Sequence, residues 1–124
     1  MTDELEWSVE FYERQDGTSP VREFLEQLDD KTQARFIWSI EQLRLRNVQA
    51  GEPLARHVEG KLWELRRASS GNLYRLLYFF FSGQRIVFVH GFQKKTEKTP
   101  RREIEIAETR MRDFLAREGV ENDR

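Results

Sequence analysis

Two polar side chains interrupt apolar runs of this 124-residue sequence; one is basic and the other titrates near neutral pH. Arg75 interrupts the run LYRLLYFFF, and His90 interrupts the run VFVHGF. An arginine can hold two phosphate oxygens at once, and a histidine can transfer protons near neutral pH. Because an unpaired buried arginine is costly, Arg75 must either pair with a carboxylate such as Glu64 or face an open groove. His90 is either a catalytic group or, as is more usual for a lone histidine in a strand, a hydrogen-bonded core residue.

Lysines and arginines are concentrated in one part of the chain. Residues 61–102 carry 10 lysines and arginines against 2 acidic residues, although the whole chain has a net charge of -1. A segregated basic block indicates a polyanionic partner, and chance clustering balanced by acidic neighbours in space is the alternative. The basic residues around the start of the last predicted helix are Lys94, Lys95, Lys98, Arg101 and Arg102. Cations at a helix start oppose the helix dipole, whereas a bound phosphate would be favoured by both, so this turn either binds a phosphate or is simply solvated.

The composition argues against several other kinds of site. The chain has no cysteine, and its two histidines, His57 and His90, lack ligand-type spacing. We therefore expect no metal and no other cofactor. The sequence contains no glycine-rich phosphate loop and no nucleophile elbow. Its start does not resemble a signal peptide, and its longest apolar run, 76–81, is too short to span a bilayer, so we expect a cytoplasmic protein without membrane insertion.

The elements that must position these residues follow from periodicity. Alternation over residues 7–12 predicts a half-buried strand. Single apolar stripes over 19–29 and 30–46 predict two short helices, which favours a helical hairpin packed on one face of a sheet. We expect the other face to be concave and partly open, with a last helix over 99–118 beside it.

Glycine and proline in residues 50–60 predict a loop. Three strand-like runs then follow at 62–68, 73–81 and 85–93, and the short turns between them favour an antiparallel meander. The predicted order is β-α-α-β-β-β-α in one α+β domain over 1–118, and residues 119–124 are expected to form a disordered tail.

The helix starts carry capping signals. Ser19 precedes a proline, Asp30 with Gln33 resembles a capping box, and Thr99 precedes Pro100.

Side chains alternate between the two faces of a strand, so residues two positions apart lie on the same face. Glu64 and Arg66 should therefore share a face of their strand, and His90 should share a face with Ile86 and Phe88.

Three motifs follow one another at a characteristic spacing: GKLWELR over 60–66, YRLLY over 74–78 and HGFQKKTEKTP over 90–100. Together they resemble the phage-derived, HigB-like branch of the RelE/ParE toxin superfamily, over nearly the whole chain. The resemblance implies a RelE-like fold and the toxin of a type II toxin–antitoxin system. Such a toxin cleaves mRNA in the ribosomal A site without a metal, by attack of the 2′-hydroxyl on the adjacent phosphate.

The resemblance also implies the binding partners of the protein: a cognate helix-turn-helix antitoxin of the HigA type, the ribosome and mRNA. Two other functions remain open: a ParE-like inhibitor of DNA gyrase, and a degenerate toxin that only binds nucleic acid or the antitoxin.

By the same resemblance, Arg75 matches a phosphate-stabilising arginine, His90 lies where some relatives carry a catalytic histidine, and Glu52 resembles the candidate base of a YoeB-like relative. The candidate catalytic residues are Arg75, His90, Arg66, Lys94 and Glu52. The candidate RNA-binding residues are Lys61, Arg66, Lys94, Lys95, Lys98 and Arg101. The catalytic tyrosine at the end of RelE and YoeB is missing here, so His90 or a lysine would have to replace it.

Overall fold

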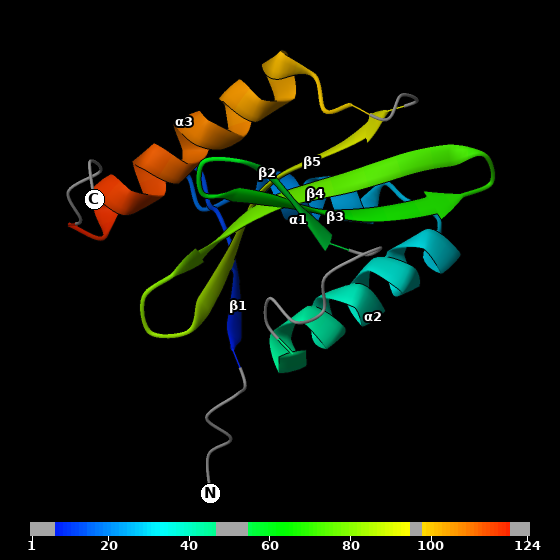
Figure 1. The fold of residues 1–124 in the computed structure, drawn as a ribbon, viewed down its shortest axis with the longest axis horizontal. Coiled ribbons are helices and arrows are strands. Elements are labelled where there is room, and N and C mark those ends of the chain that lie inside the picture. Colours follow the sequence, from blue (N-terminus) through cyan, green and yellow to red (C-terminus); the bar gives the residue numbers. More distant parts are fainter. Residues whose placement is uncertain (1–6, 47–54, 95–97, 120–124) are drawn as a thin grey trace, which may run out of the picture.

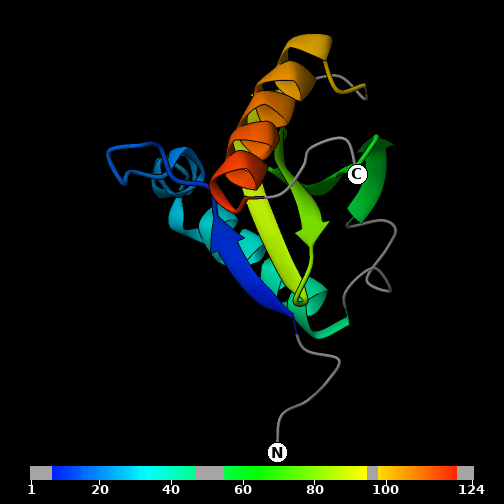
Figure 2. The same ribbon diagram turned by 90° about the vertical axis from the view of Figure 1, so that its left-hand side faces the viewer.

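The structure is a computed structural model that describes residues 7–46, 55–94 and 98–119 (Figure 1). Within these residues, a five-stranded sheet has the strand order β1-β5-β4-β3-β2. The strands are β1 (Ser8–Phe11), β2 (Ala55–Glu59), β3 (Leu62–Ser69), β4 (Asn72–Phe81) and β5 (Arg85–Lys94). The helices are α1 (Pro20–Glu26), α2 (Asp30–Arg46) and α3 (Arg101–Arg117). β1 runs parallel to β5 (Figure 2), and the other neighbouring strands are antiparallel.

This arrangement confirms the α+β class and the antiparallel meander of β3, β4 and β5. The predicted order of elements is nevertheless one strand short. Residues 55–59 were expected to be part of a loop, but they form β2 at the edge of the sheet, antiparallel to β3. The segment reads ARHVE and its register shifts at a bulge between His57 and Glu59, so it lacks the apolar alternation that predicts a strand.

The helical hairpin of α1 and α2 covers one face of the sheet, as predicted, and α3 lies on the opposite side (Figure 1). The core below the hairpin consists of Val21, Leu25, Phe36, Ile40, Leu43, Ala55, Leu65, Leu76, Tyr78, Ile86 and Phe88. Each side of the sheet therefore has its own apolar cluster, which explains why β4 is apolar on both faces.

α3 packs directly on β4 and β5, rather than beside an open face. Ile104, Ala107 and Leu115 of the helix join Leu77 and Val87 in a second buried cluster. The face expected to be concave is therefore closed over its centre, and within the part of the chain that the structure describes it is open towards β2 and β3. No helix among the described residues is long and apolar enough to cross a membrane.

A bulge changes which residues of β5 share a face. Leu77 pairs with His90, but Tyr78 pairs with Phe88, so Val89 is an extra residue between the two pairs. His90 consequently lies on the α3 side of the sheet with Leu77. The predicted grouping of His90 with Ile86 and Phe88 is wrong, because an inserted residue shifts the alternation by one position.

The two helices of the hairpin begin with capping side chains. Oγ of Ser19 accepts a hydrogen bond from the backbone N–H of Arg22 at 3.1 Å, as predicted. At α2 the cap is Asp29 rather than Asp30, since its Oδ1 accepts from the N–H of Thr32 at 2.8 Å. Residues 120–124 of the predicted tail lie outside the described residues.

Gly91 lies where β5 passes under α1, and it should tolerate no side chain. A Cβ there would stand 2.4 Å from Cδ2 of Phe24 and 2.9 Å from Cδ2 of Leu76. We expect Gly91→Ala to lower the free energy of unfolding by about 1–3 kcal/mol, measured by urea unfolding, although alanine is otherwise favoured over glycine in a strand. Adding Phe24→Leu should recover part of this loss, and a double variant no more stable than Gly91→Ala would contradict the proposed clash.

Candidate functional site

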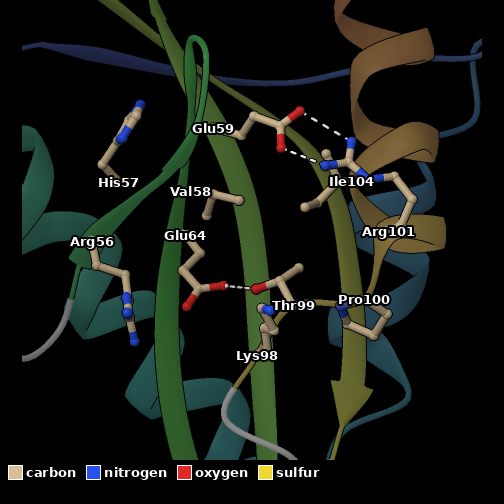
Figure 3. A pocket seen from close by; sticks show the side chains of 10 residues that line it. All are labelled: Arg56, His57, Val58, Glu59, Glu64, Lys98, Thr99, Pro100, Arg101 and Ile104. Atoms are coloured by element: carbon tan, nitrogen blue, oxygen red, sulfur yellow. Dashed lines mark hydrogen bonds and ion pairs between the residues drawn. The ribbon is translucent and has the colours of Figure 1, made fainter.

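An open cavity of about 610 Å³ lies between the β2–β3 hairpin and the start of α3 (Figure 3). Three segments form it: the consecutive strands β2 and β3, and the residues that lead into α3 and begin it, which lie far from both strands in the sequence. The lining residues are Arg56, His57, Val58, Glu59, Glu64, Lys98, Thr99, Pro100, Arg101 and Ile104. The cavity is thus on the face of the sheet that α3 leaves partly uncovered.

The cavity brings together charges of both signs. Arg56, Lys98 and Arg101 are exposed cations; the first comes from β2 and the other two come from the start of α3 and the residues that lead into it. Glu59 and Glu64 supply carboxylates, one at the mouth and one buried. Such a mixture of cations and carboxylates can bind a phosphate group and can take part in proton transfer.

His57 belongs to the wall of the cavity but points away from the other lining side chains (Figure 3). Its Nε2 lies 2.7 Å from the carbonyl oxygen of Gly60, and its ring meets Trp63 edge-on at 5.3 Å. These contacts give His57 a role in the β2–β3 hairpin rather than in the cavity.

A buried ion pair lies beneath the cavity. Nη1 of Arg75 on β4 donates to Oε2 of Glu64 on β3 at 2.6 Å, and the two side chains are only 1% and 2% exposed. Of the two alternatives that the sequence left open for Arg75, the structure has the cross-strand pair. The Arg75 guanidinium is therefore not presented to the cavity, and Glu64 is the member of the pair that lines it.

The second oxygen of Glu64 holds the entry to α3. Oγ1 of Thr99 donates to Oε1 of Glu64 at 2.7 Å. Thr99 was expected to cap α3, but the N-cap residue is Pro100 and no side chain caps this helix. The hydroxyl instead ties the helix start to the sheet, which the sequence pattern did not predict because Glu64 lies far away in the chain.

His90 is held between the sheet and α3. Its Nε2 lies 2.6 Å from Oε1 of Glu103, and its Nδ1 lies 3.1 Å from Nη1 of Arg110. Its ring stacks on Phe92, and the residue is only 9% exposed. Burial lowers the pKa of His90 and the Arg110 cation acts in the same direction, while Glu103 opposes them. A neutral ring fits these contacts, with Nε2–H donating to Glu103 and Nδ1 accepting from Arg110, as in a hydrogen-bonded core histidine.

Comparison with known families identifies the group to which this fold belongs. A family model described as "Phage derived protein Gp49-like (DUF891)" matches residues 23–112. The chain belongs to this family. The Gp49-like family is part of the RelE/HigB-type toxin group and is associated with the toxins of toxin–antitoxin systems, which implies an antitoxin partner. No curated protein matches the sequence.

The matched segment of this Gp49-like chain contains β2 to β5 and the start of α3, and hence the whole cavity. Two of the predicted RNA-binding residues, Lys98 and Arg101, line the cavity. Lys61 is exposed in the turn between β2 and β3. Arg66 is half-buried on β3, two residues beyond Glu64 and opposite Arg75 in the β3–β4 register.

The remaining predicted residues are not placed by the structure. Glu52, Lys95 and the side chain of Lys94 lie outside the described residues, although the backbone of Lys94 ends β5. Conversely, sequence reasoning missed Arg56 and Glu59, because both lie in the segment predicted to be a loop. The described part of the chain contains no group of three or more histidine, aspartate or glutamate side chains that could hold a metal ion.

Removal of Arg75 should expose how much the fold depends on the buried pair. Arg75→Ala leaves the Glu64 carboxylate buried without its cation, which we expect to lower the free energy of unfolding by about 3–5 kcal/mol. The matched control is Arg44→Ala, which breaks an exposed pair with Glu41 on α2 and should cost less than about 1 kcal/mol. Urea unfolding measures both, and equal losses would rule out a buried pair in solution.

The lowered pKa of His90 predicts a pH dependence of stability. In the unfolded chain His90 takes up a proton near its ordinary pKa of about 6.5, whereas the folded chain resists protonation until lower pH. Between these two values the unfolded state binds more protons, so the free energy of unfolding falls as the pH falls. His90→Gln lacks this titration, and its stability should decline less than that of the wild type below about pH 6.5. Urea unfolding over a pH series tests this, and identical slopes would contradict a buried neutral His90.

Proposed function

We propose that this Gp49-like protein is a toxin of the HigB-like branch that cleaves ribosome-bound mRNA without a metal ion. The observation that carries the proposal is the cavity at the start of α3, where Arg56, Lys98 and Arg101 gather around a single opening. Membership of a toxin family supports the same function. We further propose a HigA-like helix-turn-helix protein as its antitoxin.

Metal-independent cleavage requires few groups. The 2′-hydroxyl attacks the adjacent phosphate, the bond to the 5′ oxygen breaks, and the products are a 2′,3′-cyclic phosphate and a 5′-hydroxyl. The protein must orient the RNA, remove one proton, stabilise the charge on the phosphorane and protonate the leaving oxygen. The cations that line the cavity suit the stabilisation of negative charge, and the ribosome can supply the orientation of the mRNA.

In this proposal the members of the catalytic set have different roles. Arg75 acts through Glu64, which it neutralises and holds in place, so it is a positioning residue. His90 holds α3 against the sheet through Glu103, and its two ring nitrogens are both engaged. Proton transfer is then left to other groups, and the candidates are Glu59 and Lys98, which line the cavity, together with Lys94 and Glu52 of the predicted catalytic set. Arg66 keeps its proton and would instead stabilise negative charge.

A reconstituted cleavage reaction tests the proposal. Purified protein added to ribosomes that carry an mRNA should produce fragments with 5′-hydroxyl and 2′,3′-cyclic phosphate ends, and EDTA at a concentration that leaves the ribosomes intact should not prevent it. If Lys98 contacts one phosphate, Lys98→Ala should lower the salt dependence of RNA binding by about 0.7 in the slope of log affinity against log salt.

Lys31→Ala is the matched control, because Lys31 is an exposed lysine on α2, away from the cavity. An equal change in slope for both variants would show that Lys98 has no particular role. Inhibition of DNA gyrase without any cleavage of mRNA would overturn the proposal and favour a ParE-like inhibitor.

A further inference from the structure

An ion pair spans the mouth of the cavity. Arg101 is the first residue of α3, and Glu59 is the last residue of β2. Nη1 of Arg101 donates to Oε2 of Glu59 at 3.0 Å, and Nη2 donates to Oε1 at 2.5 Å (Figure 3). The carboxylate thus occupies two of the guanidinium N–H groups side by side.

This two-bond arrangement is also how a guanidinium holds a phosphate. Arginine binds carboxylates and phosphates in the same planar, bidentate way, so one can replace the other on the same N–H groups. Two further cations, Arg56 and Lys98, line the same cavity and would add to the attraction of an RNA strand, which carries one negative charge at every phosphate.

The pair is also easy to open. The Arg101 side chain is 56% exposed and the Glu59 side chain is 40% exposed, so water and salt reach both. Exposed ion pairs of this kind contribute little to stability, and an incoming anion can compete with them. By contrast, Glu64 in the same cavity is buried and bound to Arg75, so its carboxylate is not available for exchange.

We propose that, in the free protein, Glu59 occupies the position on Arg101 that an RNA phosphate takes when substrate binds. Glu59 is thereby an internal competitor that lowers the affinity of the cavity for RNA. This inference rests on the proposed function, because it requires that the cavity binds RNA phosphate.

Competition between Glu59 and RNA predicts how the effect of removing Glu59 depends on the salt concentration. Added salt weakens both the Glu59–Arg101 pair and the attraction of RNA to the cavity. Removal of Glu59 should therefore help binding most at low salt, and the advantage should shrink as the ionic strength rises.

Binding of a short 2′-O-methyl RNA oligonucleotide, which cannot be cleaved by 2′-hydroxyl attack, measures the effect by fluorescence anisotropy. Glu59→Gln keeps the shape of the side chain and removes its charge. We expect it to raise the affinity at low salt by roughly two- to fivefold, the range set by the strength of an exposed pair. Circular dichroism checks that the variant is folded, and Glu59→Ala should behave in the same way.

Two controls separate competition from a general loss of negative charge. Glu105→Gln removes a carboxylate from α3 that acts on Arg101 only as a nearby charge, and it should raise the affinity less than Glu59→Gln. Glu41→Gln breaks the exposed pair with Arg44 on α2 and should leave the affinity unchanged.

The decisive comparison is made in an Arg101→Gln chain. Without its guanidinium, Glu59 has nothing to compete for, so Glu59→Gln should then gain no more than Glu105→Gln does. An equal gain with and without Arg101, or no gain at all, would overturn the inference.

The binding assay needs no catalysis, so its outcome is independent of the cleavage test. A gain that requires Arg101 in a protein that cleaves no mRNA would support the competition and refute the nuclease function. Cleavage of mRNA without such a gain in affinity would support the nuclease function and refute the competition.

Discussion

A guanidinium and a carboxylate lie buried side by side at the centre of the sheet, Arg75 on β4 and Glu64 on β3. Neither charge is tolerated in an apolar interior without the other, so the two strands must keep the alignment that joins them. The other oxygen of Glu64 binds Thr99, and this bond fixes where the chain enters α3. The location of Arg101, and with it the shape of the cavity mouth, therefore depends on an ion pair that lies beneath the cavity.

Further polar contacts hold α3 along its length. Nη1 of Arg110 reaches both the carbonyl oxygen of Val89 and the ring of His90, and Glu103 binds the opposite ring nitrogen. Nearer the end of the helix, Tyr12 donates to Asp113 at 2.7 Å. α3 is thus attached at its start, middle and end. These contacts fix the junction between helix and sheet at which the cavity lies. A fixed junction of this kind lowers the cost of orienting a bound substrate.

Periodicity alone was sufficient to predict most of this fold. The meander and the hairpin helices bury regular apolar patterns, and such patterns are visible in one sequence. β2 was missed because a short, charged edge strand buries little and needs no alternation. The predicted side of the sheet for His90 was wrong, because the composition of a strand does not reveal one inserted residue. The bond from Thr99 to Glu64 could not be predicted, since it joins side chains that only the folded sheet brings together.

The charge pattern of the chain requires a similar correction. The basic block of residues 61–102 suggests a strongly positive surface, yet at least three of its ten cations are paired with carboxylates of the same chain. Arg75 is bound to Glu64, Arg85 binds both Glu10 and Glu118, and Arg101 binds Glu59. These acidic partners balance part of the block in space, so the net charge of the block is a poor guide to how strongly it would attract a polyanion. Recognition of a polyanion must then depend on the few places where a cation can exchange its partner, and an exposed pair at a cavity mouth is far better suited to this than a buried one.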